Sequence, residues 1–356
     1  MLTILKYILK NRQLKRLKSN PSTRGFTMVE LLVSTIVAFL IITPLLSFVV
    51  DILDTDVKEQ SKANTEQELQ SAVSYITNDL KEAVYIYDGD GTKSIAESIA
   101  EKLKGDCILE KEEEEGCIPV LVFWKQQLIE DIVPVNKTND QVGEDHCDSN
   151  PCDDAQVYSL VAYYLITGNK GNSPWSGAAR IGRLEIRDGV RNPAEYYDYL
   201  DEGGDKMELA KRDSGFQIFD ISPTIAGTFE QKMEKWEPNG EITKNIEVLV
   251  DYVDHTSGSE YINETPENDT VPDDDFCEDN LGSSGNSNGN ADLVGDPETY
   301  RGFFACVDSK QTLAQVYIVG NGLARSKDGA KYQENEAALF PTVTITVKGR
   351  GVLSGS

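Results

Sequence analysis

The sequence predicts an α+β protein in which a long N-terminal helix packs on an antiparallel β-sheet with loop-rich insertions. Residues 31–50 form an uncharged, mostly apolar run. Over residues 66–84 the apolar positions recur at steps of three and four, as they do on one face of a helix. Further along the chain, short runs of β-branched and aromatic residues alternate with turn-rich segments, a pattern typical of antiparallel strands.

The apolar run of residues 31–50 is long enough to cross a bilayer as a helix, which takes about 20 residues. Glu30 stands at its edge, where a charge is costly and therefore indicates a function. Residues 1–25 contain seven basic and no acidic side chains, which predicts a cytoplasmic location for this end. The whole chain has a net charge of −26, so the remainder carries −26 − 7 = −33 and is expected outside the cytoplasmic membrane.

Residues 25–34 read Gly-Phe-Thr-Met-Val-Glu-Leu-Leu-Val-Ser. This segment, including Thr27, resembles the class III signal of type IV pilins and type II secretion pseudopilins. The resemblance implies that a prepilin peptidase cuts between Gly25 and Phe26, removes residues 1–25 as a basic leader, and methylates the amino group of Phe26. It also implies that Glu30 pairs in a filament with the amino terminus of a neighbouring subunit. An ordinary single-pass anchor is the alternative, but it gives Glu30 no purpose.

The helix is expected to run from Phe26 to Tyr85, about 90 Å at 1.5 Å per residue. Residues 26–53 would be its membrane or filament-core half, and residues 54–87 its amphipathic half. Turn residues at 87–91 predict its end. Pro44 removes a backbone hydrogen bond and predicts a kink or loosened turn near residues 40–44. The resemblance gives Pro44 a role in assembly, and a tolerated membrane proline is the alternative.

Residues 54–356 are expected to form an extracytoplasmic head. After the helix comes a variable region, residues 88–117, with helical spacing at 94–104 and a charged loop at 110–115. The sheet region covers residues 118–255 and 307–351, interrupted by an acidic insertion at 256–306 that is poor in apolar residues. Strands are predicted at residues 118–124, 157–167, 181–187 (half-exposed by its alternation), 246–253, 314–319 and 342–347, and a short helix around 228–236.

Six cysteines in an exported domain indicate three disulfides, for which fifteen connectivities are open. A sequential pairing is favoured because each bond would close a polar, turn-rich loop. The pairs are Cys107–Cys117, Cys147–Cys152 and Cys277–Cys306. Zinc binding is the alternative, but the spacings and the two histidines do not complete a usual ligand set.

Two groups of side chains are candidate ligand sites. The acids Asp273, Asp274 and Asp275 beside Cys277 are candidate calcium ligands, although no EF-hand spacing is present and a solvated acidic loop is the favoured interpretation. No other cofactor is expected. Several aromatic residues are candidates for stacking on sugar rings, with a core role as the favoured alternative. They are Trp175, Tyr196, Tyr197, Tyr199 and Trp236.

Catalysis and nucleic-acid binding are not expected. The chain has no nucleophile elbow, paired-histidine zinc motif or phosphate loop. Its strongly acidic body would repel nucleic-acid phosphates. A membrane-anchored enzyme is therefore the least favoured of the functional hypotheses.

Two further stretches resemble a narrower group. Residues 157–187 are similar to large minor pseudopilins, and residues 55–87 to cyanobacterial pseudopilins of the hormogonium polysaccharide secretion system. The resemblance implies a single-pass inner-membrane protein with a cytoplasmic N-terminus, assembled into a filament that supports polysaccharide secretion and gliding motility. Implied partners are the prepilin peptidase, other pseudopilins or pilins, the inner-membrane assembly platform and a polysaccharide. The alternatives are a tip adhesin of a conventional type IV pilus and a pseudopilin of type II protein secretion.

Overall fold

The computed structural model describes residues 25–103, 116–134, 151–168, 174–190, 212–265, 271–281 and 291–351. The chain divides into two units, Met1–Thr55 and Asp56–Ser356, and helix α2 (Met28–Lys81) contributes to both. The second unit contains helices and antiparallel sheets, so the α+β class is confirmed. Its other helices are α3 (Gly89–Lys102), α5 (Phe229–Met233), α6 (Gly258–Glu264), α7 (Asp274–Leu281) and the 3₁₀ turns η2 (Leu323–Arg325) and η3 (Glu334–Leu339).

Two antiparallel sheets form in the second unit, where the sequence predicted one. The first has the strand order β1-β2-β3-β4-β5 and the second β6-β7-β8-β9. The strands of the first are β1 (Ala83–Ile86), β2 (Gly116–Pro134), β3 (Cys152–Thr167), β4 (Ala179–Arg187) and β5 (Glu247–Val253). Those of the second are β6 (Asp292–Val294), β7 (Phe303–Asp308), β8 (Leu313–Val319) and β9 (Thr342–Lys348). All six predicted strands are present, and β2 extends well beyond residue 124.

Helix α2 ends earlier than predicted. It stops at Lys81, and residues 83–86 form β1, which pairs antiparallel with β2 around Phe123–Lys125. The prediction of a helix through Tyr85 is therefore wrong. All four residues of β1 are buried, so both of its faces are apolar and no alternation marks it as a strand. Pro44 lies inside α2, and residues 40–44 are helical, so the expected loosening does not interrupt the helix.

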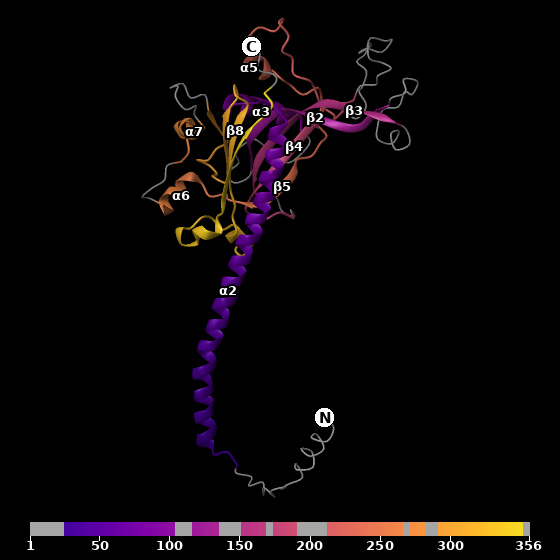
Figure 1. Ribbon diagram of the computed structural model, residues 1–356. Helices are drawn as coiled ribbons and strands as arrows, with labels where there is room; N and C mark the ends of the chain where they lie inside the picture. Colours follow the sequence, from indigo (N-terminus) through magenta and orange to yellow (C-terminus); the bar gives the residue numbers. More distant parts are fainter. Residues whose placement is uncertain are drawn as a thin grey trace, which may run out of the picture. The chain divides into compact units, whose positions relative to one another are not determined.

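The C-terminal part of α2 lies against strands of both sheets (Figure 1). Its buried positions recur at steps of three and four, which confirms the amphipathic pattern; they are Ser61, Thr65, Leu69, Ala72, Ile76, Asp79 and Leu80. The main core joins the apolar members of this set, from Leu69 to Leu80, to one face of the first sheet and to the second sheet. A second core on the other face of the first sheet contains Trp124 and is covered by α3 and α5. The helix is thus a core element of the second unit.

The acidic insertion at residues 256–306 is more structured than predicted. It contains α6, α7, β6 and the beginning of β7. Strand β7 was not predicted, although all six of its residues are buried. The disulfide Cys277–Cys306 joins α7 to β7, as expected from the sequence. Within the predicted variable region, α3 begins at Gly89 after the N-cap Asp88, five residues before the predicted start at residue 94. The charged loop at 110–115 lies outside the described residues.

Candidate functional site

The N-terminal end of α2 is closed by a capping box between Thr27 and Glu30. Thr27 Oγ1 accepts a hydrogen bond from the backbone N–H of Glu30 at 3.3 Å, and the backbone N–H of Thr27 donates to Glu30 Oε2 at 3.3 Å. This reciprocal arrangement satisfies two backbone donors that a helix start otherwise leaves without partners. Because the N-terminal end of a helix carries a partial positive charge, it also favours the carboxylate of Glu30. In the single chain, Glu30 therefore has a local structural role.

Gly25 and Phe26 precede the helix in non-helical backbone. Both are exposed, and apart from its two chain neighbours no described residue has an atom within 4 Å of the position that a Cβ on Gly25 would occupy. The peptide bond between them is therefore sterically open. The Gly25–Phe26 bond and the Glu30 carboxylate lie at the same end of α2, within six residues of each other.

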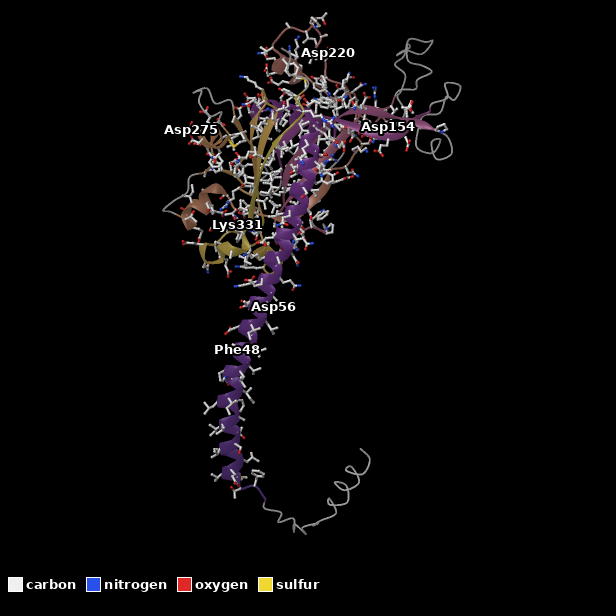
Figure 2. All side chains as sticks on the ribbon, viewed as in Figure 1. Phe48, Asp56, Asp154, Asp220, Asp275 and Lys331 are labelled. Atoms are coloured by element: carbon white, nitrogen blue, oxygen red, sulfur yellow. A yellow bond between two sulfur atoms is a disulfide. The ribbon has the colours of Figure 1, made fainter. Side chains whose placement is uncertain are left out.

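The first unit presents an apolar helical surface. Among the described residues, α2 is the one helix that is long and apolar enough to cross a membrane. Every large apolar side chain from Phe26 to Leu53 is exposed, and Phe48, which is labelled in Figure 2, is 61% exposed. A contiguous apolar surface of this size needs lipid or other apolar helices as its surroundings.

A buried ionic cluster connects α2 to the first sheet. The carboxylate of Asp79 on α2 accepts three hydrogen bonds: from Lys125 Nζ of β2 at 2.9 Å, from Tyr163 OH of β3 at 2.7 Å, and from Arg183 Nε of β4 at 2.7 Å. Arg183 Nη2 also donates to Glu185 Oε2 at 2.7 Å. Three strands therefore supply polar partners to one helical side chain.

The charges in this cluster stabilise one another. Burial by itself would raise the pKa of Asp79, but the hydrogen bond and charge of Arg183, with those of Lys125, outweigh it and hold the pKa below its usual value. The carboxylate is therefore ionised near neutral pH. A rotation or shift of α2 would leave buried charges without partners, which is strongly unfavourable. The cluster thus defines the position of α2 on the sheet.

The sequence pattern did not indicate this cluster. It predicted residues 181–187 as a half-exposed strand, yet Arg183 is only 7% exposed, because its face of β4 is turned toward α2. That expectation was wrong because both faces of β4 are covered, the face of Arg183 by α2 and the face of Leu184 and Ile186 by the second core with α3 and α5. One signal was available: Asp79 follows Ile76 by three residues and therefore lies on the apolar face of the helix. A buried acid on such a face requires a basic partner elsewhere in the chain.

Two of the candidate calcium ligands instead accept hydrogen bonds from backbone N–H groups. Asp273 Oδ1 accepts a hydrogen bond from the backbone N–H of Phe276 at 2.9 Å, and Asp274 Oδ1 accepts one from the backbone N–H of Leu293 at 3.1 Å. Asp275 is exposed on α7 (Figure 2). Within the described part of the chain, no group of three or more His, Cys, Asp or Glu side chains is arranged to hold a metal ion. The calcium proposal has no support from this geometry.

The aromatic candidates for sugar binding separate into distinct environments. Trp236 is 4% exposed and donates from Nε1 to the backbone carbonyl of Gln217, so it has a core role. Trp175 is 38% exposed and lines a groove of about 600 Å³. The three tyrosines Tyr196, Tyr197 and Tyr199 lie outside the described residues.

Besides Cys277–Cys306, two of the described cysteines take part in disulfides. They are Cys117, at the beginning of β2, and Cys152, at the beginning of β3. Their expected partners, Cys107 and Cys147, lie outside the described residues, so these two pairings stay predictions.

The comparisons with known proteins identify no relative. A scan against models of protein families gives no match, and searches of curated proteins and of solved structures give none either. The family is therefore inferred from the residues of this chain alone.

Proposed function

We propose that the protein is a structural minor pseudopilin of a type IV pilus-like or type II secretion-like apparatus that supports extracellular polysaccharide secretion and gliding motility. One observation carries the proposal: an open Gly25–Phe26 bond stands directly before a capped helix whose first turn holds Glu30 and whose next 20 residues are uncharged. Neither a soluble helix nor a simple membrane anchor needs this combination.

In this proposal, a prepilin peptidase of the inner membrane cuts after Gly25 and methylates the new amino group on Phe26. The mature helix then moves from the membrane into a filament, where apolar helices of neighbouring subunits replace lipid around residues 28–53. The ammonium of one subunit pairs with Glu30 of the next, since two opposite charges can share an apolar interior when each neutralises the other. The inner-membrane assembly platform supports this transfer.

The capping box makes a sharp test possible, because it separates the structural role of Glu30 from its charge. Glutamine also closes a capping box, and this chain provides an example: Gln231 forms one with Thr228 at α5. Glu30→Gln therefore keeps the cap and removes the charge, while Glu30→Ala removes both. We expect both variants to be made and inserted, and neither to enter the filament. Subunits in sheared filaments and subunits in membranes are measured by quantitative immunoblotting.

Two results would overturn the proposal. If Glu30→Gln assembled as well as the wild type, Glu30 would act as a helix cap and not as a charge partner. If mass spectrometry of the mature wild-type protein found a first residue other than N-methylated Phe26, processing after Gly25 would be wrong. Gly25→Val serves as the control that blocks cleavage, and it should retain residues 1–25 and stay in the membrane.

A tip adhesin of a conventional type IV pilus is the second candidate, favoured by the exposed groove at Trp175. Deleting residues 256–296 would not discriminate between the two functions, because Cys277 and Val294 of this segment are buried. Trp175→Ala is the better variant. Loss of surface adhesion with normal polysaccharide export would favour the adhesin, and the reverse would favour the secretion pseudopilin.

A further inference from the structure

We propose that the groove between α2 and β5 binds a neutral polysaccharide chain, with the indole of Trp175 as the surface on which a sugar ring stacks. The groove has a volume of about 600 Å³, within the range of known ligand sites. All of its lining residues belong to the second unit. They are Asn64, Gln67, Glu68 and Ser71 of α2, Pro174 and Trp175, and residues 248–252.

Trp175 is exposed on a firmly held loop. The next residue, Ser176, donates from its backbone N–H to Asp251 Oδ2 at 2.9 Å and from Oγ to Asp251 Oδ1 at 2.7 Å. The backbone N–H of Gly177 donates to Asp328 Oδ1 at 3.0 Å. These three bonds hold the backbone next to Trp175 before any ligand arrives, which lowers the entropy lost on binding. Trp236, by contrast, is buried in the core.

The part of the groove that α2 contributes is rich in neutral polar groups. Asn64, Gln67 and Ser71 are spaced by three and four residues, so they lie on one face of α2. A primary amide carries both donors and acceptors, as sugar hydroxyl groups do. The side-chain amides of Asn64 and Gln67 are exposed and make no hydrogen bond to another described residue. One groove that holds an aromatic ring, two amides and a hydroxyl matches the two aspects of a sugar: apolar C–H groups on the face of the ring and hydroxyls at its edge.

The charges of the groove select a neutral ligand. The charged side chains among its lining residues are the carboxylates of Glu68 and Asp251, and the chain carries a net charge of −26. Arg325 pairs with Glu68, and Ser176 donates to Asp251, so both carboxylates are held in place. A uronate or sulfated polymer would bring further negative charge to this surface and be repelled.

An extended peptide is a weaker match for the groove. Strand β5 is an edge strand, to which a peptide would add by backbone pairing. However, the backbone N–H of Asn321 already donates to the carbonyl of Tyr252 at 2.7 Å. The backbone N–H of Asp254 likewise donates to the carbonyl of Val319 at 2.9 Å. These bonds occupy the C-terminal end of the edge and leave a short stretch for pairing. A sugar chain contacts side chains and does not need a continuous edge.

Binding is tested on the full chain, purified in a sugar-free zwitterionic detergent so that no detergent headgroup competes. The probes are cellohexaose, maltohexaose, mannohexaose and xylohexaose, with hexagalacturonate as the anionic comparison. Trp175 is the exposed one of the three tryptophans, since Trp124 and Trp236 are buried. We expect at least one neutral probe to shift the tryptophan emission to shorter wavelength and to give a saturable calorimetric signal, and hexagalacturonate to bind more weakly.

Matched variants assign the signal to the groove. Trp175→Ala should lower the affinity about tenfold, and Trp175→Phe should retain part of it, because a smaller ring still stacks. Gln67→Ala should lower the affinity about threefold through the loss of an amide contact. Gln70→Ala is the control: it changes the same residue type on the same helix, exposed but outside the groove lining, and should bind like the wild type.

Three outcomes would overturn this proposal: no neutral probe binds, Trp175→Ala binds like the wild type, or hexagalacturonate binds best. If Trp175→Ala alters self-association in sedimentation and leaves sugar binding unchanged, a second copy of the chain occupies the groove instead. The proposal adds a ligand class to the proposed function but fails separately from it. Glu30→Gln should bind sugar normally, and Trp175→Ala should still be cleaved after Gly25.

The source of the glycan is distinguished in cells. If the groove serves the exported polymer, Trp175→Ala should reduce the secreted polysaccharide while cells still attach to glycan-coated surfaces. If it serves a foreign surface glycan, attachment should fall and secretion should stay normal. Either result supports a neutral-glycan site, and no change in either measurement contradicts it.

Discussion

Asp79 of α2 and Arg183 of β4 form a buried ion pair in which Arg183 Nε lies 2.7 Å from Asp79 Oδ2. The two residues are 104 positions apart in the chain. Each is less than a tenth exposed, so neither charge can be satisfied by water if the other is lost. The pair therefore links α2 to the first sheet, and the two charges meet only when the helix lies in its correct position.

Removing Asp79 should strongly destabilise the second unit. Asp79→Ala leaves Lys125 and Arg183 buried without their shared carboxylate, a loss worth about 3–5 kcal/mol. The free energy of unfolding is measured by denaturant titration of the full chain in detergent. Asn78→Ala, at the exposed neighbouring position, is the matched control and should change this free energy by less than about 0.5 kcal/mol. A loss below about 1 kcal/mol for Asp79→Ala would refute the structural role of the cluster.

Asp254 should make the second unit less stable as the pH rises. Burial raises its pKa to about 6, despite the hydrogen bonds from Thr256 and the charge of Arg301. The usual value, 3.8, applies to the unfolded chain, so the folded state binds this proton more tightly. The stabilisation of the folded state by this bound proton is therefore complete below pH 3.8, and it is lost as the pH rises through 6. Between pH 4 and 7 this site should lower the free energy of unfolding by roughly 2 kcal/mol.

The variant Asp254→Asn isolates this effect, because asparagine does not titrate. Asp292 also has its pKa raised to about 6, chiefly by burial, and contributes a trend of the same sign in both proteins. The quantity to follow is the free energy of unfolding of the wild type minus that of Asp254→Asn. This difference should become more negative from pH 4 to 7, and a constant difference would contradict the prediction.

The disulfide Cys277–Cys306 should stabilise the second sheet. It closes a separation of 29 residues and joins α7 to the buried strand β7. The loop-entropy model gives a contribution of about 3.5 kcal/mol. The double variant Cys277→Ser, Cys306→Ser should lose an amount of this order in denaturant unfolding. A reductant is not a substitute for the variant, because Cys117 and Cys152 are also disulfide-bonded. Unchanged unfolding would show that the packing of α7 alone holds this region.

The hydroxyl of Tyr87 should be necessary for the second core. It accepts a hydrogen bond from Trp124 Nε1 at 3.0 Å and donates one to the backbone carbonyl of Met233 at 3.0 Å. Tyr87→Phe leaves both buried groups without this partner and should cost about 1–3 kcal/mol of unfolding free energy. Tyr75→Phe, at a ring that is 46% exposed, is the control and should be nearly neutral. Equal stability of the two variants would argue against the importance of this network.

Several elements could be predicted because their signal is local. Strand β3 carries a long β-branched and aromatic run, and α2 carries a repeat of three and four, so both were found with small errors at their ends. Strand β7 was missed because a polar segment precedes it and its six residues are buried on both faces, which removes any alternation. Of the two exposed features now proposed as sites, Gly25–Glu30 is contiguous and was predicted. The groove at Trp175 was not predicted, because its walls come from three separate parts of the chain: α2, the loop that precedes β4, and strand β5.

The sequence by itself determined the apolar helix, the Gly25-Phe26 and Glu30 motif at its beginning and the α+β class, because each depends on residue type and short-range spacing. It favoured the pairing of Cys277 with Cys306, which the tertiary structure then confirmed. Only the tertiary structure decided that there are two sheets, that Arg183 is buried against Asp79, and that Trp175 is exposed while Trp236 is not. Burial depends on what covers a residue, and the covering segments are distant in the chain. The spacing of residues along one element does not indicate which distant segment covers them.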